Sequence, residues 1–143
     1  MKNVNRLTIV TIILNFFILV AGGHGIGFLG LIEFFCFPEF FNGNRKFSLF
    51  GNYNDRLFTA ATLAIVGQII LSIAYLKKIQ VQKFTITYLG LFILLFSYFI
   101  LTMDFYNSTI DGFSFWAGIP FLAFAIILLI RTIKNHKLTL TTE

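Results

Sequence analysis

Three ionisable side chains lie within or beside long apolar stretches of the sequence: His24, Glu33 and Asp104. Imidazole titrates near neutral pH, so a histidine beside a carboxylate suits proton relay or acid–base chemistry. Ionisable groups in apolar segments are costly unless they are paired or hydrated, and they therefore often mark a working site. In the simpler alternative, His24 bonds a backbone carbonyl and Asp104 faces water. Glu33 carries more weight, because its neighbours on both sides are apolar.

A second group of polar side chains lies deeper in the apolar stretches. Asn15 and Gln68 each lie well inside a separate stretch, at about the same height if both stretches are helical. They are predicted to meet as a buried amide pair. Buried amides most often join helices by hydrogen bonds, and the lining of a polar pathway is the alternative.

Four long apolar runs must position these side chains, and each is close to the ~20 residues that a helix needs to cross a membrane. The sequence is 57% hydrophobic and 12% charged, and that charged share is well below the usual one of soluble domains. The predicted fold is therefore an all-α, polytopic, up-down-up-down bundle of four transmembrane helices in one domain over residues 1–143. The helices are expected at about 7–30, 57–77, 84–104 and 113–132, with an extended outer loop over 31–56.

The end of the first run is ambiguous. Apolar residues continue to Phe37, and one helix from Leu7 to Phe37 would be about 46 Å long. The helix is either broken at Gly22–Gly25 or continuous with a bend. Continuity is slightly favoured, because Gly23, Gly27 and Gly30 would then form one helical stripe suited to close packing.

A stripe of small residues also marks the second predicted helix: Ala60, Ala64 and Gly67. Small residues allow two helix backbones to approach each other closely. This stripe is predicted to pack against another helix, either within the bundle or in a second subunit.

The basic residues predict an orientation. Eight of the eleven lysines and arginines fall in the N-terminus, in the connection after the second helix and in the C-terminal tail. Basic loops stay in the cytoplasm, so both termini are expected there. The protein is predicted to be a multi-pass protein of the cell membrane, in bacteria the inner membrane. The net charge of +5 is interpreted as orientation, and no nucleic-acid partner is expected.

The lipid bilayer is thus the first expected partner, and a homo-oligomer or a larger membrane complex is possible. No cofactor and no metal are expected. The single cysteine cannot form an intrachain disulfide, and the topology puts His24 and His136 on opposite sides of the membrane.

Three functional hypotheses remain open. The first is a small transport component or accessory subunit with an outward-facing polar pocket, in which His24, Glu33 and Asp104 titrate. The second is a structural or interaction protein, for example of an immunity or defence type, that acts through helix packing. The third is an intramembrane enzyme on a lipid-like substrate, with His24 and a carboxylate as acid and base; a non-enzymatic role is favoured.

Overall fold

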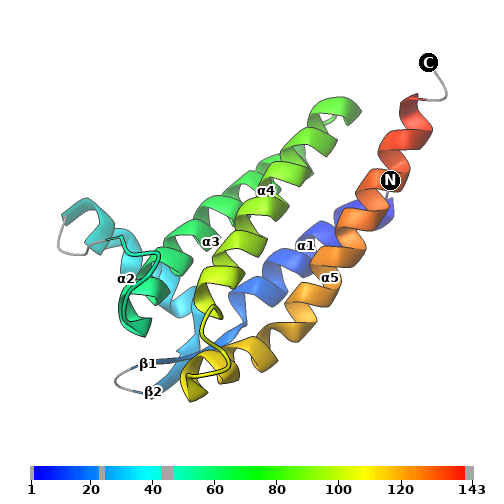
Figure 1. Ribbon diagram of the computed structural model, residues 1–143. Helices are drawn as coiled ribbons and strands as arrows, with labels where there is room; N and C mark the ends of the chain where they lie inside the picture. Colours follow the sequence, from blue (N-terminus) through cyan, green and yellow to red (C-terminus); the bar gives the residue numbers. More distant parts are fainter. Residues whose placement is uncertain (1, 23–24, 43–46, 141–143) are drawn as a thin grey trace.

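The computed structural model describes residues 2–22, 25–42 and 47–140, and most of these are helical. Figure 1 shows the arrangement, in which the start of the first helix and the end of the last one lie at the same end of the molecule. The elements in chain order are α1 (Lys2–Phe16), β1 (Leu19–Gly22), β2 (Gly25–Phe28), α2 (Leu29–Asn42), α3 (Tyr53–Leu76), α4 (Gln80–Leu101) and α5 (Thr109–Leu140).

Three of the described helices are long and apolar enough to cross a membrane: α3, α4 and α5. They correspond to the helices predicted at 57–77, 84–104 and 113–132, so this part of the sequence interpretation is confirmed. Helix α1 is a shorter apolar helix. The protein is therefore compatible with a membrane location, whereas a bundle of four transmembrane helices is not confirmed.

The first predicted helix, 7–30, is wrong beyond Phe16. Helix α1 ends there, and an antiparallel hairpin follows in which Leu19 pairs with Phe28 and Gly22 with Gly25. Gly25 has a φ of 139°, a backbone conformation that glycine adopts without strain. Glycines near the turn and the β-branched residues Val20 in β1 and Ile26 in β2 favour a hairpin over further helix.

The hairpin also removes the predicted glycine stripe. Gly27 lies in β2 and Gly30 lies in α2, so the two do not share one helical face, and Gly23 lies outside the described residues. Gly30 nevertheless allows a close approach, because a Cβ atom there would lie 2.2 Å from the Phe16 ring. Gly30 thus brings the start of α2 against the end of α1.

The extended outer loop predicted over 31–56 is also wrong in its first half. Helix α2 continues to Asn42 and packs against α3. Its apolar run allows helix formation, and tertiary contact with α3 stabilises it. The end of the predicted loop is helical too, since α3 begins at Tyr53.

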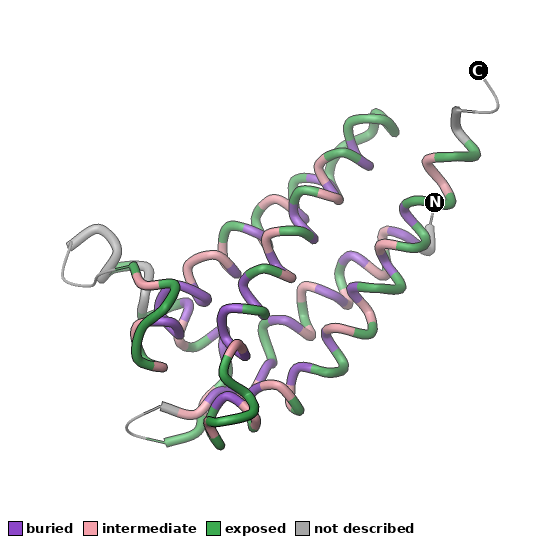
Figure 2. Tube along the Cα trace, in the orientation of Figure 1, coloured by how far each residue is buried: buried purple, intermediate pink, exposed green. Residues whose placement is uncertain are grey.

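The small-residue stripe of α3 packs within the chain. Ala60 and Ala64 are fully buried, and a Cβ atom on Gly67 would lie 2.8 Å from Leu94 of α4. Ser97 of α4 donates a hydrogen bond of 2.7 Å to the carbonyl of Ala60. Figure 2 shows that buried and exposed positions alternate along the helices, so that each has an inward face. Helices α3 and α4 thus form a tightly packed antiparallel pair that supports the polar residues.

Candidate functional site

Glu33 lies in α2, one turn after the hairpin, and is only 5% exposed. The Nε2 atom of Gln68 on α3 donates a 2.9 Å hydrogen bond to its Oε1 atom. The turn from β2 into α2 therefore brings a carboxyl group against the middle of α3.

Asn15 at the end of α1 belongs to the same network. The Gln68 Nε2 atom also donates a 2.9 Å hydrogen bond to Asn15 Oδ1, so one amide bridges Asn15 and Glu33. Asn15 is fully buried, and its own Nδ2 atom has no partner in the described part of the chain. The Oγ1 atom of Thr11, one helical turn earlier, is likewise without one. The network therefore has unused hydrogen-bonding capacity.

The surroundings of Glu33 are electrically neutral. Among the side chains that the structure describes, no lysine or arginine forms an ion pair with Glu33. Its one hydrogen bond there comes from the neutral Gln68 amide. Burial therefore raises the pKa of the Glu33 carboxyl to about 7, and the Gln68 bond offsets only part of this rise. Glu33 lies on α2, outside the three helices that are long enough to span.

Glu33 also lines a pocket of about 460 Å³ at the junction of three helices. Among the described lining residues, the others are apolar apart from the glycine backbone, so Glu33 is the one polar residue in this part of the lining. The lining residues are Phe16 of α1, Ile65 of α3, and Gly30, Leu31, Glu33, Phe34 and Pro38 of α2. This pocket differs from the outward-facing polar pocket that the sequence suggested.

Asp104 does not share the Glu33 site. It lies in the connection between α4 and α5, is exposed, and accepts a 3.0 Å hydrogen bond from the side chain of Asn107. The Asp104 backbone N–H donates to Asp111, which pairs with Arg56 of α3. Arg56 lies twelve residues before Gln68, or about 18 Å along the helix. His24, the third predicted titrating group, lies outside the described residues.

A second buried carboxyl group, Asp111 on α5, was not singled out by the sequence. Its Oδ2 atom lies 2.8 Å from Arg56 Nη1 and accepts a 3.0 Å bond from the Asp104 backbone N–H. Its Oδ1 atom accepts a 3.2 Å bond from the Ser108 hydroxyl. Arg56 also donates to the carbonyls of Gly51 and Ile100. Nothing in the spacing of Arg56 and Asp111 signals the pair, because it forms only when α4 packs against both α3 and α5.

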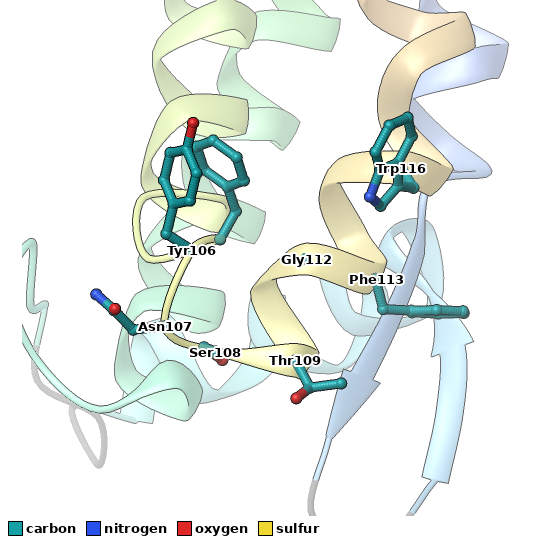
Figure 3. A pocket seen from close by; sticks show the side chains of 8 residues that line it. Tyr106, Asn107, Ser108, Thr109, Gly112, Phe113 and Trp116 are labelled. Atoms are coloured by element: carbon teal, nitrogen blue, oxygen red, sulfur yellow. The ribbon is translucent and has the colours of Figure 1, made fainter.

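Beside this ion pair, the α4–α5 connection carries an outer pocket of about 410 Å³. Figure 3 shows Tyr106 on the connection and Trp116 on α5, with the backbone of residues 107–112 between them. Both aromatic residues are largely exposed. Amphipathic rings at the end of apolar helices suit the boundary between lipid and water, so this pocket fits an interfacial aromatic belt. Its lining residues are Phe105, Tyr106, Asn107, Ser108, Thr109, Gly112, Phe113 and Trp116.

Metal binding finds no support in the described residues. They contain no cluster of three or more histidine, cysteine or acidic side chains positioned to hold an ion. The chemistry that the Glu33 site offers is therefore the gain and loss of a proton, or ion pairing with a ligand.

The fold and the site together define a small helical protein compatible with a membrane, with one buried carboxyl group hydrogen-bonded to neutral amides. No protein-family model matches the sequence, and no curated protein and no solved structure matches the chain.

Proposed function

We propose that the protein is a small transport component of a cell membrane, and that Glu33 is the group that takes up and releases a proton during its cycle. Both termini lie in the cytoplasm in this proposal, as the distribution of basic residues predicts. The observation that carries it is the placement of a buried carboxyl group, without a basic partner in the described chain, beside a pocket between α1, α2 and α3.

The groups that face Glu33 make a proton the natural counter-charge. On α1 the charged residues are Lys2 and Arg6, nine or more residues before Asn15, and β2 carries none. On α3 they are Asp55 and Arg56, at the far end from Gln68. On α2 itself, Glu39 follows six residues later, and its side chain lies outside the described part. An isolated buried carboxylate is costly, so proton uptake relieves the cost.

The amide network suits both protonation states of Glu33. When Glu33 is ionised, Gln68 Nε2 donates to Glu33 and Asn15, as in the structure. When Glu33 is protonated, it becomes a donor. Rotation of both the Gln68 and the Asn15 amides then lets the Gln68 oxygen accept from Glu33 and from Asn15 Nδ2, which is unpaired in the structure. Gln68 can therefore donate to the ionised Glu33 and accept from the protonated Glu33, which suits a group that exchanges protons.

Proton flux in liposomes tests the proposal. The purified protein is reconstituted with a trapped pH-sensitive dye, an outward potassium gradient with valinomycin is imposed, and internal acidification is followed. Wild-type protein should accelerate acidification, and Glu33→Gln should reduce the rate to that of protein-free vesicles. Asp104→Asn, which removes an exposed acid, serves as the matched control. Flux that is equal in wild type and Glu33→Gln contradicts the proposal.

An interaction protein is the second candidate, and a specific feature favours it. Strand β2 pairs with β1 along one edge only, and Ile26 and Phe28 on it are exposed. Exposed strand edges are ready templates for pairing with another chain, including a second copy. Cross-linking at an introduced Gly27→Cys in membranes tests this candidate: a discrete adduct supports it, and a monomeric protein at all cross-linker concentrations contradicts it.

The enzyme hypothesis receives no comparable support. Glu33 and Asp104 lie in separate sites, and His24 falls outside the described residues. No acid–base pair that includes either acid is therefore available for it in the described part of the chain.

A further inference from the structure

We infer that the Glu33 pocket binds a small lipophilic molecule with a single positive charge, and that the cationic head lies at the Glu33 carboxylate. This inference names the ligand class of the proposed transport site and rests on that proposal. It means that the cation and the proton compete for the same carboxyl group.

The charge of the ligand follows from the partners of Glu33. Glu33 is 5% exposed as a residue, and the neutral Gln68 amide is its sole hydrogen-bond partner among the described residues. A buried carboxylate is tolerated when a proton or a cation neutralises it, since the attraction between opposite charges is strong where water is excluded. An anion would instead meet a like charge in an apolar site, and a dication would keep one charge uncompensated.

The lipophilic body of the ligand follows from the other walls. Phe16 and Phe34 contribute aromatic rings to the lining, and Leu31 and Ile65 contribute aliphatic surface. Aromatic faces attract ammonium-type cations, the more so when the cation is desolvated. A volume of about 460 Å³ lies within the usual range of small-molecule sites. The pocket therefore combines one anchoring charge with an apolar, partly aromatic enclosure.

The position of the walls indicates how the ligand arrives. Phe34 is 76% exposed and Leu31 is 49% exposed, so one side of the pocket opens at the surface of the molecule. A membrane protein turns such large apolar side chains toward lipid. A molecule already dissolved in the bilayer can therefore enter from the side, without crossing the polar ends of the helices.

A matched pair of probes tests the inference. Benzyltrimethylammonium carries a permanent charge, and neopentylbenzene is its uncharged carbon isostere of nearly the same shape. Binding of each to the full chain in phosphatidylcholine nanodiscs is measured by equilibrium dialysis, with empty nanodiscs subtracted. The cation should bind at least tenfold more tightly than the isostere at pH 8. Its affinity should fall by up to about tenfold per pH unit as Glu33 becomes protonated below its pKa, while binding of the isostere should not depend on pH.

Variants assign the effect to the pocket. Glu33→Gln should remove the preference for the cation and its pH dependence, and Asp104→Asn should preserve both. Phe34→Ala changes a largely exposed side chain, leaves the fold intact, and should weaken both probes by severalfold. Equal binding of the two probes to wild type, cation binding by Glu33→Gln at the wild-type level, or an unchanged Phe34→Ala variant would each overturn the inference.

The two proposals fail in different ways. If Glu33-dependent proton flux is observed while both probes bind equally, the ligand class is wrong and the transport role stands. If the cation binds through Glu33 and no Glu33-dependent flux occurs, the pocket is a binding site and the transport role is wrong.

Discussion

Two buried carboxyl groups in this protein have opposite surroundings. Asp111 is fully buried and is held by the Arg56 guanidinium, by the Asp104 backbone N–H and by the Ser108 hydroxyl. Glu33 is almost as buried, and the described chain gives it one neutral amide. Asp111 therefore has both a counter-charge and donors for both of its oxygens, whereas Glu33 has neither.

The comparison shows that burial alone does not predict what a carboxyl group does. Asp111 joins α5 to α3 and to the α4–α5 connection through its ion pair and hydrogen bonds. Its environment suits a structural role, because the ion pair and the hydrogen bonds hold three segments together. The neutral environment of Glu33 makes its charge costly, so this group is suited to exchange a proton or to bind a cation.

The largest predicted effect concerns the ion pair. Arg56→Met leaves Asp111 buried without its counter-charge and should destabilise the protein by about 3–5 kcal/mol. The measurement is thermal unfolding in detergent, followed by circular dichroism. The double variant Arg56→Met with Asp111→Asn should recover most of the loss, because the uncompensated charge is gone. A double variant as unstable as Arg56→Met alone would mean that the guanidinium acts through packing and not through charge.

Glu33 should respond to pH in the opposite sense to a salt-bridged acid. Its pKa in the folded protein is raised to about 7 from 4.5, so the folded state binds a proton more tightly than the unfolded state does. Stability should therefore rise as pH falls from about 7 toward 4.5, by on the order of 3 kcal/mol at most. Glu33→Gln should lack this contribution in unfolding titrations over that range. If the wild type and Glu33→Gln show the same pH profile, Glu33 is not the buried titrating group.

The sequence predicted the three helices that are long and apolar enough to span a membrane, because their apolar runs are long and uninterrupted. The amide pair also followed from height alone, and the structure places Asn15 Oδ1 within 2.9 Å of Gln68 Nε2. These two predictions depend on local composition and on the constant rise of a helix, and both can be applied to the sequence alone.

Such reasoning could not predict where the helix in the first apolar run ends. Hydrophobicity does not distinguish a helix from a buried strand, and the glycines there support a tight turn as well as a packing stripe. A straight first helix would carry Glu33 far above Gln68, whereas the hairpin brings the chain back and places them in contact. The Glu33 site therefore depends on the hairpin and on α2, both of which were predicted wrongly. The Arg56–Asp111 pair depends on helix packing that no spacing reveals.

A smaller effect is expected when the tight packing of α3 against α4 is disturbed. Gly67→Leu introduces a side chain whose Cβ would lie 2.8 Å from Leu94 and 3.2 Å from the Gly90 carbonyl. Such overpacking should cost about 1–3 kcal/mol in thermal unfolding. Gly27→Leu is the matched control, since a Cβ at Gly27 meets nothing within 4 Å, and it should be close to neutral. Equal losses in both variants would show that α3 and α4 do not pack as tightly as the structure indicates.

The smallest effect is expected at Asp104. A substitution there distinguishes the role of its side chain from that of its backbone. Its backbone N–H donates to Asp111, but its side chain is exposed and accepts one hydrogen bond from Asn107. Asp104→Asn keeps the backbone donor, so unfolding should change by less than about 0.5 kcal/mol, and proton flux should be unchanged. A large loss of stability would place the Asp104 charge inside the Arg56–Asp111 cluster. A loss of flux at wild-type stability would instead join Asp104 to the Glu33 site, because its side chain would then act on the same proton.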